Sequence, residues 1–181
     1  MARRDSAARR YAEAAFEVAT RDDAIAAWRS ELDAIAARLS DPRVTAVLAN
    51  PAIALDQRSV ALAGLLEGVA TTGPANLVQL LLKRGRIEEV PRVAEEFRRL
   101  DDRRQNVIHA TVTSAAPLTP DELRALTARL EQSTGGRIAL DTAIDASLLG
   151  GIIVRVGDRL IDGSVRGRLE RLRNQLISGA L

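Results

Sequence analysis

The chain has 181 residues, of which 46% are hydrophobic and 28% charged, a balance typical of a folded protein and not of a disordered one. Basic and acidic residues nearly cancel to a formal net charge of +2, and both signs are mixed along the chain, so no basic domain for a polyanion is indicated. The absence of cysteine excludes disulfides, thiolate metal sites and cysteine nucleophiles.

The composition changes near residue 106. Val, Ile, Thr and Gly become more frequent after this point, whereas all the aromatic residues precede it: Tyr11, Phe16, Trp28 and Phe97. Such a change is typical of a helical region followed by a mixed one. We therefore predict an α+β protein with two domains, residues 1–105 and residues 106–181.

The first domain is expected to be a six-helix bundle, because apolar residues recur there at helical spacing between cap and breaker residues. The expected boundary residues are Ser6 and then Asp22 or Asp23 as caps of the first two helices, Asp41-Pro42 at the third, Asn50-Pro51 after it, Pro74 and Gly85 around the fifth, and Ile87 with Pro91 at the start of the sixth.

The second domain is expected to be a small α/β domain of order β-α-β-β-α. Alternating β-branched residues predict strands over 107–113, 137–144 and 151–156, and residues 159–161 are interpreted as an extension of the last strand through a hairpin. A capping box at Thr119 predicts the first helix, and Ser164 is expected to cap the second.

The first helix carries more apolar surface than one core needs. One stripe is formed by Ala8, Ala12, Ala15, Phe16 and Ala19, and a second lies beside it, formed by Ala7, Tyr11, Ala14 and Val18. In the fifth helix Leu77, Leu80 and Leu81 are assigned to the core, with Ala75, Val78 and Leu82 as surplus. Periodicity alone leaves two interpretations open: both helices are buried all round, or they form a groove for a partner helix.

Signals of catalysis or of a cofactor are nearly absent. The only histidine, His109, falls within a predicted strand, and Gly150-Gly151 leads into a strand, whereas phosphate-binding loops lead into a helix. The N-terminus has no signal-peptide core, and no apolar run approaches the ~20 residues that a membrane span requires. We expect no catalytic, cofactor-binding or metal-binding residues, and no nucleic-acid partner.

Several segments carry a resemblance to a known family. They are Arg10-Tyr11-Ala12 with Ala15-Phe16-Glu17, the stretch 77–87, Val112-Thr113-Ser114-Ala115, the stretch 145–158, Ile161-Asp162-Gly163-Ser164 and the stretch 169–172. With these segments the chain resembles, over nearly its whole length, the delta subunit of the bacterial F-type ATP synthase, the counterpart of the mitochondrial oligomycin-sensitivity-conferring protein.

The resemblance implies a non-catalytic stator subunit that keeps the catalytic head from rotating with the rotor. Residues 1–105 would dock on the head by holding the N-terminal helix of an alpha subunit, and residues 106–181 would dock on the C-terminal region of the peripheral-stalk b subunits. The implied alpha-subunit contacts are Tyr11, Ala14, Ala15, Val18, Val78 and Leu82, and the structural signature of the second domain is Gly150, Gly151, Gly157, Asp158, Asp162 and Ser164.

The implied location is the cytoplasmic face of a bacterial plasma membrane, where the chain would be peripheral and reach the membrane only through the complex. The alternative from another class is a stand-alone helical scaffold or a nucleic-acid adaptor. An adaptor of that kind would bind a polyanion with a steep dependence on salt.

Overall fold

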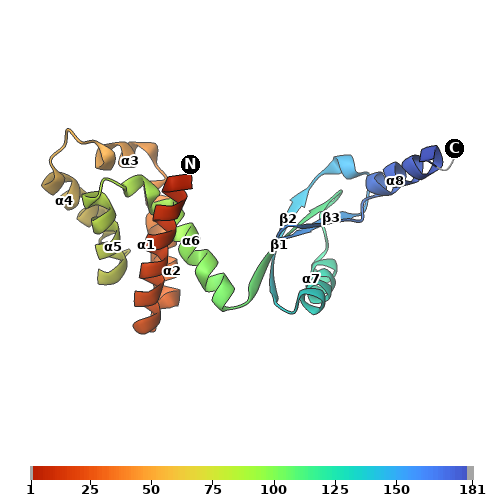
Figure 1. Cartoon of the computed structure of the whole chain (residues 1–181), viewed down its shortest axis with the longest axis horizontal. Coiled ribbons are helices and arrows are strands. Elements are labelled where there is room, and N and C mark those ends of the chain that lie inside the picture. The colour runs from red at the N-terminus through yellow and green to blue at the C-terminus, as the bar shows by residue number, and fades with distance from the viewer. Residues whose placement is uncertain (1, 179–181) are drawn as a thin grey trace. The chain divides into compact units, whose positions relative to one another are not determined.

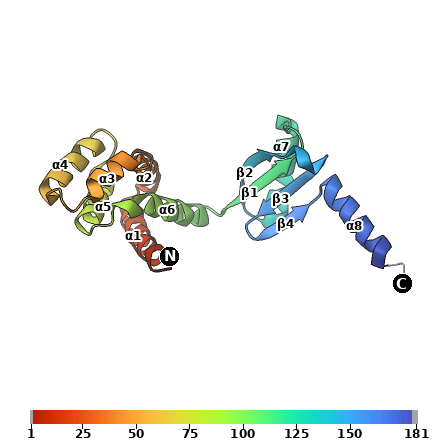
Figure 2. The ribbon, with the colours of Figure 1, turned by 90° about the horizontal axis from the view of Figure 1, so that it is seen from above.

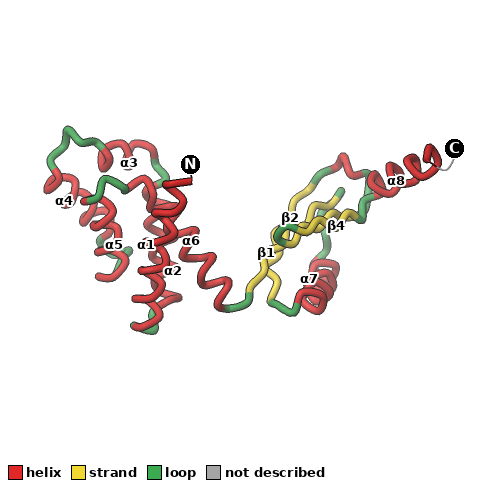
Figure 3. Tube along the Cα trace, in the orientation of Figure 1, coloured by secondary structure: helices red, strands yellow, loops and turns green. Residues whose placement is uncertain are grey.

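The computed structural model describes residues 2–178, with side chains from residue 7 to residue 177. By its internal contacts the chain divides into two compact units, Met1–Asp101 and Asp102–Leu181. The first unit contains only helices among its described residues, and the second contains the sheet (Figures 1 and 3). The expected α+β class is therefore confirmed.

The first unit has the six expected helices and one short 3-10 turn. They are α1 (Ala2–Arg21), α2 (Ile25–Leu39), α3 (Pro42–Ala49), α4 (Leu55–Leu66), α5 (Thr72–Lys83), the 3-10 turn η1 (Ile87–Glu89) and α6 (Val90–Arg104). Three local predictions are confirmed. The Asp41 carboxylate accepts a hydrogen bond from the Arg43 N–H at 2.8 Å, Gly85 ends α5 with φ +65°, and Pro91 lies in the first turn of α6.

Two predicted helix starts are wrong. Helix α1 begins at Ala2, so Ser6 lies inside it instead of capping it. Helix α2 follows Ala24, and no side chain caps it. Asp23 has a left-handed φ of +49°, and the Ala24 N–H reaches back to the Ala19 carbonyl at 2.8 Å. The aspartate therefore closes the end of α1 instead of opening α2.

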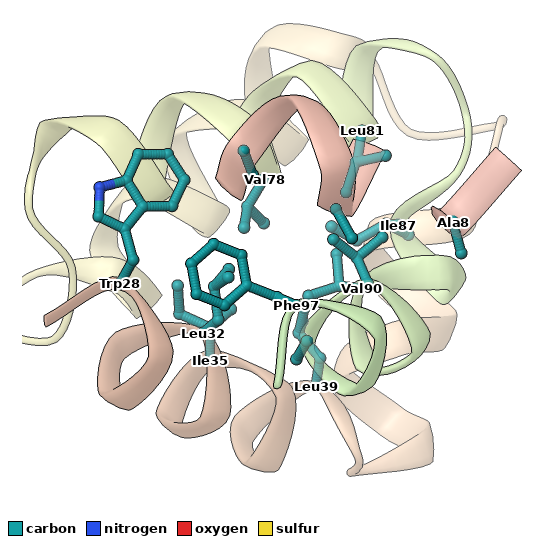
Figure 4. Close-up of a cluster of buried hydrophobic side chains, with 14 of the residues drawn as sticks. Ala8, Trp28, Leu32, Ile35, Leu39, Val78, Leu81, Ile87, Val90 and Phe97 are labelled. Carbon is teal, nitrogen blue, oxygen red and sulfur yellow. The ribbon is translucent and has the colours of Figure 1, made fainter. Parts of the chain in front are cut away.

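The core of the first unit combines small residues on α1 with a group of aromatic rings. Ala8, Ala12, Ala15 and Ala19 are all buried, which confirms the first predicted stripe and lets the backbone of α1 approach its neighbours closely. Phe97 is fully buried at the centre, stacked against Trp28 with ring centroids 6.2 Å apart (Figure 4). Phe16 meets Phe97 edge to face at 5.3 Å.

The second unit is a four-stranded mixed sheet with helices between and after its strands. Its elements are β1 (Val107–Ser114), α7 (Pro120–Thr134), β2 (Arg137–Ile144), the 3-10 turn η2 (Ala146–Leu148), β3 (Ile152–Val156), β4 (Arg159–Asp162) and α8 (Val165–Ser178). The strand order is β2-β1-β3-β4, with β1 and β2 parallel and the other neighbours antiparallel (Figure 2). The segment expected only to extend a hairpin is thus a separate fourth strand.

Helix α7 connects the two parallel strands, and it starts at the predicted capping box. The Thr119 hydroxyl accepts from the Glu122 N–H at 3.3 Å, while the Glu122 carboxylate accepts from the Thr119 N–H at 2.8 Å. The core beneath α7 is small: its buried members are Ala110, Val112, Leu130 and Val154. Helix α8 lies outside this core, since none of its large apolar side chains belongs to the buried cluster.

Candidate partner-binding surfaces

The second apolar stripe of α1 is only partly covered by the bundle. Ala7 is buried, Tyr11 and Val18 are half-buried against the core, and Ala14 is exposed. These residues recur at i, i+4, i+7 and i+11, so they lie on one side of the helix. An exposed alanine between two half-buried larger residues makes a shallow apolar surface that a second helix can approach closely.

On α5 the expected division between core and surplus is confirmed for Leu81, which is fully buried, and wrong for three other residues. Val78 and Leu82, assigned to the surplus, are 0% and 1% exposed, whereas Leu80, assigned to the core, is 41% exposed. Together with Ala15 on α1, which is 4% exposed, Val78 and Leu82 have almost no side-chain surface to offer a partner. Their role in this structure is to pack the core beneath the exposed residues.

Contacts at two points fix the rotation of α5. The Gln79 amide donates to the Ser59 carbonyl at 3.1 Å, so this side of α5 faces α4. At the start of α5, a Cβ on Gly73 would lie 2.4 Å from the Trp28 ring, so the helix packs there directly against α2. Leu77 and Leu80 follow Gly73 at i+4 and i+7, so they lie on the same side of α5; Leu77 is half-buried against the core and Leu80 is exposed.

Helices α1 and α5 belong to one core. Both contribute buried residues to the same cluster, and they run close to each other in Figures 1 and 2. The exposed apolar residues of the two helices, Ala14 and Leu80, with the half-buried Tyr11, Val18 and Leu77, are called the α1/α5 surface below.

The glycine pair of the second unit shapes the junction between β3 and α8. Gly151 has φ +76°, and a Cβ there would lie 2.5 Å from the Gly163 carbonyl oxygen. The Gly163 N–H donates to the Ile152 carbonyl at 2.9 Å, and the Val165 N–H donates to the Gly150 carbonyl at 3.0 Å. Two backbone segments therefore touch directly, and only glycine at position 151 allows the contact.

Asp162 and Ser164 hold the first turn of α8. The Asp162 carboxylate accepts from the Ser164 N–H at 2.8 Å and from the Ser164 hydroxyl at 2.7 Å, and that hydroxyl oxygen accepts from the Gly167 N–H at 3.0 Å. Ser164 is thus the predicted N-cap. Hydrogen bonds from the Ser164 hydroxyl and N–H, with a smaller contribution from the Arg171 charge, lower the pKa of Asp162 below its ordinary value.

The remaining signature residues have simpler places. Gly157 and Asp158 form the exposed turn between β3 and β4, where Gly157 has φ +56° and a Cβ would meet no atom within 4 Å. Before the glycine pair, the Asp145 carboxylate accepts from the Ser147 N–H at 2.9 Å. Hydrogen bonds from Ser147 lower the pKa of Asp145.

Sequence reasoning missed two residues at the α8 junction. A Cβ on Gly167 would lie 2.2 Å from the Asp162 carboxylate, so this helical glycine is required by a tertiary contact. A glycine in the first turn of a predicted helix was the available signal, since glycine weakens helices. Leu149 has a left-handed φ of +61° and is 74% exposed, an unusual conformation for a leucine with no packing inside the chain to favour it.

No alternative site for chemistry appears in the part of the chain that the structure describes. His109 lies on β1 with its Nε2 atom 2.7 Å from the carboxylate of Asp102, the first residue of the same unit. Within residues 2–178, no three His, Cys, Asp or Glu side chains lie close enough to hold a metal ion. None of the described helices has the length and hydropathy needed to cross a bilayer.

Comparison with known proteins decides the family. The model of the ATP synthase delta (OSCP) subunit family matches residues 7–176. The chain belongs to this family. An ATP synthase subunit delta from Xanthomonas campestris pv. campestris (strain B100) is 38% identical over 169 residues, covering 93% of this chain and 95% of the relative. Another from Laribacter hongkongensis is 36% identical over 178 residues, covering 98% and 100%.

A solved structure shares the fold. A chain in the Toxoplasma gondii mitochondrial ATP synthase hexamer superposes with a TM-score of 0.64 at 24% identity, covering 94% of this chain and 97% of its own length. As a delta/OSCP subunit, the chain is a non-catalytic component of the ATP synthase, and it acts in ATP synthesis and proton transport. It is the stator component that links the F1 head to the peripheral stalk.

Proposed function

We propose that the two units divide the stator function between them. Residues 1–105, which comprise the first unit and the last residues of α6, bind the N-terminal helix of an alpha subunit at the top of the catalytic head. Residues 106–181, which carry the sheet of the second unit and α8, bind the C-terminal region of the peripheral-stalk b subunits. The complex holds the chain at the cytoplasmic face of a bacterial plasma membrane, with no direct membrane contact.

The observation that carries the first half of the proposal is the α1/α5 surface. A helix laid along this surface would cover Tyr11, Ala14 and Val18 on one side and Leu77 and Leu80 on the other. Docking an amphipathic helix removes apolar area from water on both partners, at about 25 cal/mol per Å². Ala15, Val78 and Leu82 support the surface from below and keep it in place.

Binding of the second unit to the peripheral stalk is supported by the contacts that hold the N-terminus of α8. The signature residues Gly150, Gly151, Asp162 and Ser164 fix the first turn of α8 against the sheet. The helix beyond this turn carries its apolar residues in the open. A helix that is held firmly at one end and left uncovered along its length is suited to presenting a contact surface to another chain.

The mechanism is mechanical. The rotor exerts torque on the head as it turns, and ATP synthesis requires that the head stays fixed while the rotor moves. A chain that binds the head through one surface and the stalk through another transmits this torque to the stalk. It needs two separate interfaces on rigid elements, and it needs no catalytic group of its own.

The α1/α5 surface is tested by titration calorimetry. The probe is a synthetic peptide of the first ~20 residues of the alpha subunit from the same organism, titrated into the full-length chain. Tyr11→Asp and Leu80→Asp place a charge in an apolar contact, so we expect each to weaken binding about tenfold or more, which corresponds to about 1.4 kcal/mol. Both residues keep solvent contact in the free chain, so folding should be preserved.

The matched control is Val60→Asp. Val60 is 73% exposed on α4, next to Ser59, whose carbonyl accepts the Gln79 hydrogen bond, and it is not one of the residues of the α1/α5 surface. Binding within twofold of the unsubstituted chain is expected for this variant, and Trp28 fluorescence confirms an intact core. Unchanged affinity in Tyr11→Asp and Leu80→Asp, or an equal loss in Val60→Asp, contradicts binding at the α1/α5 surface.

A further inference from the structure

Helix α8 exposes a regular apolar seam. Val165, Leu169, Leu172 and Leu176 are 42%, 55%, 52% and 67% exposed, and none packs into the core of the second unit. Their spacing of four, three and four residues is the spacing of a and d positions in a heptad repeat. In this register Leu169 and Leu176 are a positions, and Val165 and Leu172 are d positions.

The residues beside the seam carry one sign of charge. In the same register Arg166 and Arg173 occupy e positions, and Arg168 occupies a g position. Arg166 pairs with Glu170 within the helix at 3.3 Å, whereas no ion pair joins Arg168 or Arg173 to any residue among those described. The e and g positions of a coiled coil select the partner through charge, so this seam favours acidic residues opposite it.

The charge pattern argues against a second copy of this chain as the occupant. Two α8 helices would bring arginine against arginine along the seam, in parallel or antiparallel orientation, and like charges at these positions are destabilising. A lipid surface is also a poorer match than a helix. The seam has two residues per heptad and no aromatic residue, whereas membrane-surface helices have a broad apolar face with Trp or Phe.

Hydrogen bonds at the N-terminus of α8 fix the start of the seam. The Ser164 hydroxyl caps the helix, and the Gly150 carbonyl accepts from the Val165 N–H, so the first residue of the seam is fixed beside the η2–β3 loop. Leu149, 74% exposed in its left-handed conformation, directly precedes Gly150. Gly150 in turn lies beside Val165, since a Cβ on Gly150 would be 3.2 Å from the Val165 side chain, so Leu149 is one residue from the start of the seam.

We propose that α8 is one strand of a coiled coil with another protein. The partner strand is an amphipathic helix with Leu, Ile or Val at its a and d positions and with Asp or Glu at its e and g positions. The inference rests on the proposed binding of the second unit to the peripheral stalk. It identifies α8 as the surface that binds and gives the chemistry of the partner helix. Leu149 caps the apolar contact at the N-terminal end of α8.

The test uses the full-length chain and two synthetic heptad peptides of three repeats. Both have leucine at a and d; one has glutamate at every e and g position, and the other has lysine there. We expect the acidic peptide to bind at least about tenfold more tightly than the basic one, with an affinity that falls as salt rises. Arg168→Glu with Arg173→Glu should reverse this preference.

The seam itself is tested with a matched pair of truncations. Leu172→Ala removes a seam residue, whereas Ile177→Ala removes an apolar residue of similar exposure, 65%, at a position outside the seam. We expect Leu172→Ala to weaken binding of the acidic peptide about tenfold and Ile177→Ala to leave it within twofold. Equal effects of the two variants, or equal binding of the two peptides, would overturn the coiled-coil assignment.

Three further measurements separate the possible outcomes. A recombinant C-terminal half of the b subunit from the same organism should bind the full-length chain and lose affinity with Leu172→Ala. If it binds both forms equally, the coiled coil is overturned while stalk binding stands; if it does not bind but the acidic peptide does, stalk binding fails and the coiled coil stands. Sedimentation of a dimer through α8, or preferential binding to vesicles of phosphatidylglycerol and phosphatidylcholine, would also overturn the proposal.

Discussion

Gly151→Ala adds one methyl group where β3 meets the start of α8. With φ +76°, an L-residue at this position pays about 1 kcal/mol for a left-handed backbone. The new Cβ would also lie 2.5 Å from the Gly163 carbonyl oxygen, which is backbone and has no rotamer to change. The two backbone segments, 150–151 and 163–165, must therefore move apart, which breaks the Gly163–Ile152 and Val165–Gly150 hydrogen bonds, each contributing about 1 kcal/mol.

The expected loss is about 3 kcal/mol in the free energy of unfolding of the second unit. For a unit of this size, each kcal/mol lowers the melting temperature by about 4–8 °C, so we expect a decrease of about 12 °C or more. Gly157→Ala is the matched control. Gly157 also has a positive φ, +56°, but its Cβ would meet no atom within 4 Å, so only the backbone cost of about 1 kcal/mol remains.

The assay separates the two units within the intact chain. The only tryptophan, Trp28, lies in the first unit, so its fluorescence follows that unit alone, whereas far-UV circular dichroism follows both. Gly151→Ala should shift part of the dichroism transition and leave the fluorescence transition in place. Equal melting of Gly151→Ala and Gly157→Ala, or a fluorescence transition that moves with the dichroism, would refute the reasoning.

Two more predictions follow from local contacts. Gly73→Ala places a Cβ 2.4 Å from the Trp28 ring, so the free energy of unfolding of the first unit should fall by about 1–3 kcal/mol, measured by urea unfolding followed by fluorescence. Gly64→Ala, which has open space in α4, should instead raise it by about 0.5–1 kcal/mol. A change of the same sign in both variants would contradict this reasoning. The lowered pKa of Asp162 contributes stability above the unfolded pKa, and this is lost as pH falls below about 4. Dichroism melts between pH 6 and 3 should show this loss reduced in Ser164→Ala.

Local signals in the sequence located most helix ends correctly. Asp41 before Pro42, Gly85 after an apolar run, and Thr119 three residues before Glu122 each satisfy backbone groups within a few residues, so no tertiary information is needed. Ser6 and Asp23 are the exceptions: Ser6 lies inside α1, and Asp23 lies at its C-terminal end. The Asp23 side chain is suited to cap the start of α2. In the structure its left-handed backbone instead lets the Ala24 N–H donate to the Ala19 carbonyl and end α1, and the short sequence is compatible with either role.

The rotation of α5 could not be predicted from its own residues. The run from Leu77 to Leu82 is apolar except for Gln79, so no polar stripe marks the outer face. The contacts that decide the rotation come from other helices, through the Ser59 carbonyl and the Trp28 ring. The apolar stripe of α1 was predicted more accurately because its alternation with arginine and glutamate is regular.

Gly150 and Gly151 were predicted as structural signature residues of the second domain, but the residues that they contact at the α8 junction were not predicted. Gly163 and Gly167 meet Gly151 and Asp162 only after β3, β4 and α8 have assembled. A glycine inside a helix is unfavourable on local grounds, and only the approach of the Asp162 carboxylate explains it. Long-range contacts of this kind leave an isolated glycine in the sequence but do not identify its neighbour.

The same junction bears on how load passes through the second unit. The backbone of residues 150–151 meets the backbone of residues 163–165 without intervening side chains. Side-chain joints yield by changing rotamer, whereas this one has no such freedom and resists displacement until its hydrogen bonds break. A twist applied along α8 would therefore reach the sheet with little loss, as a stiff link between the head and the stalk requires.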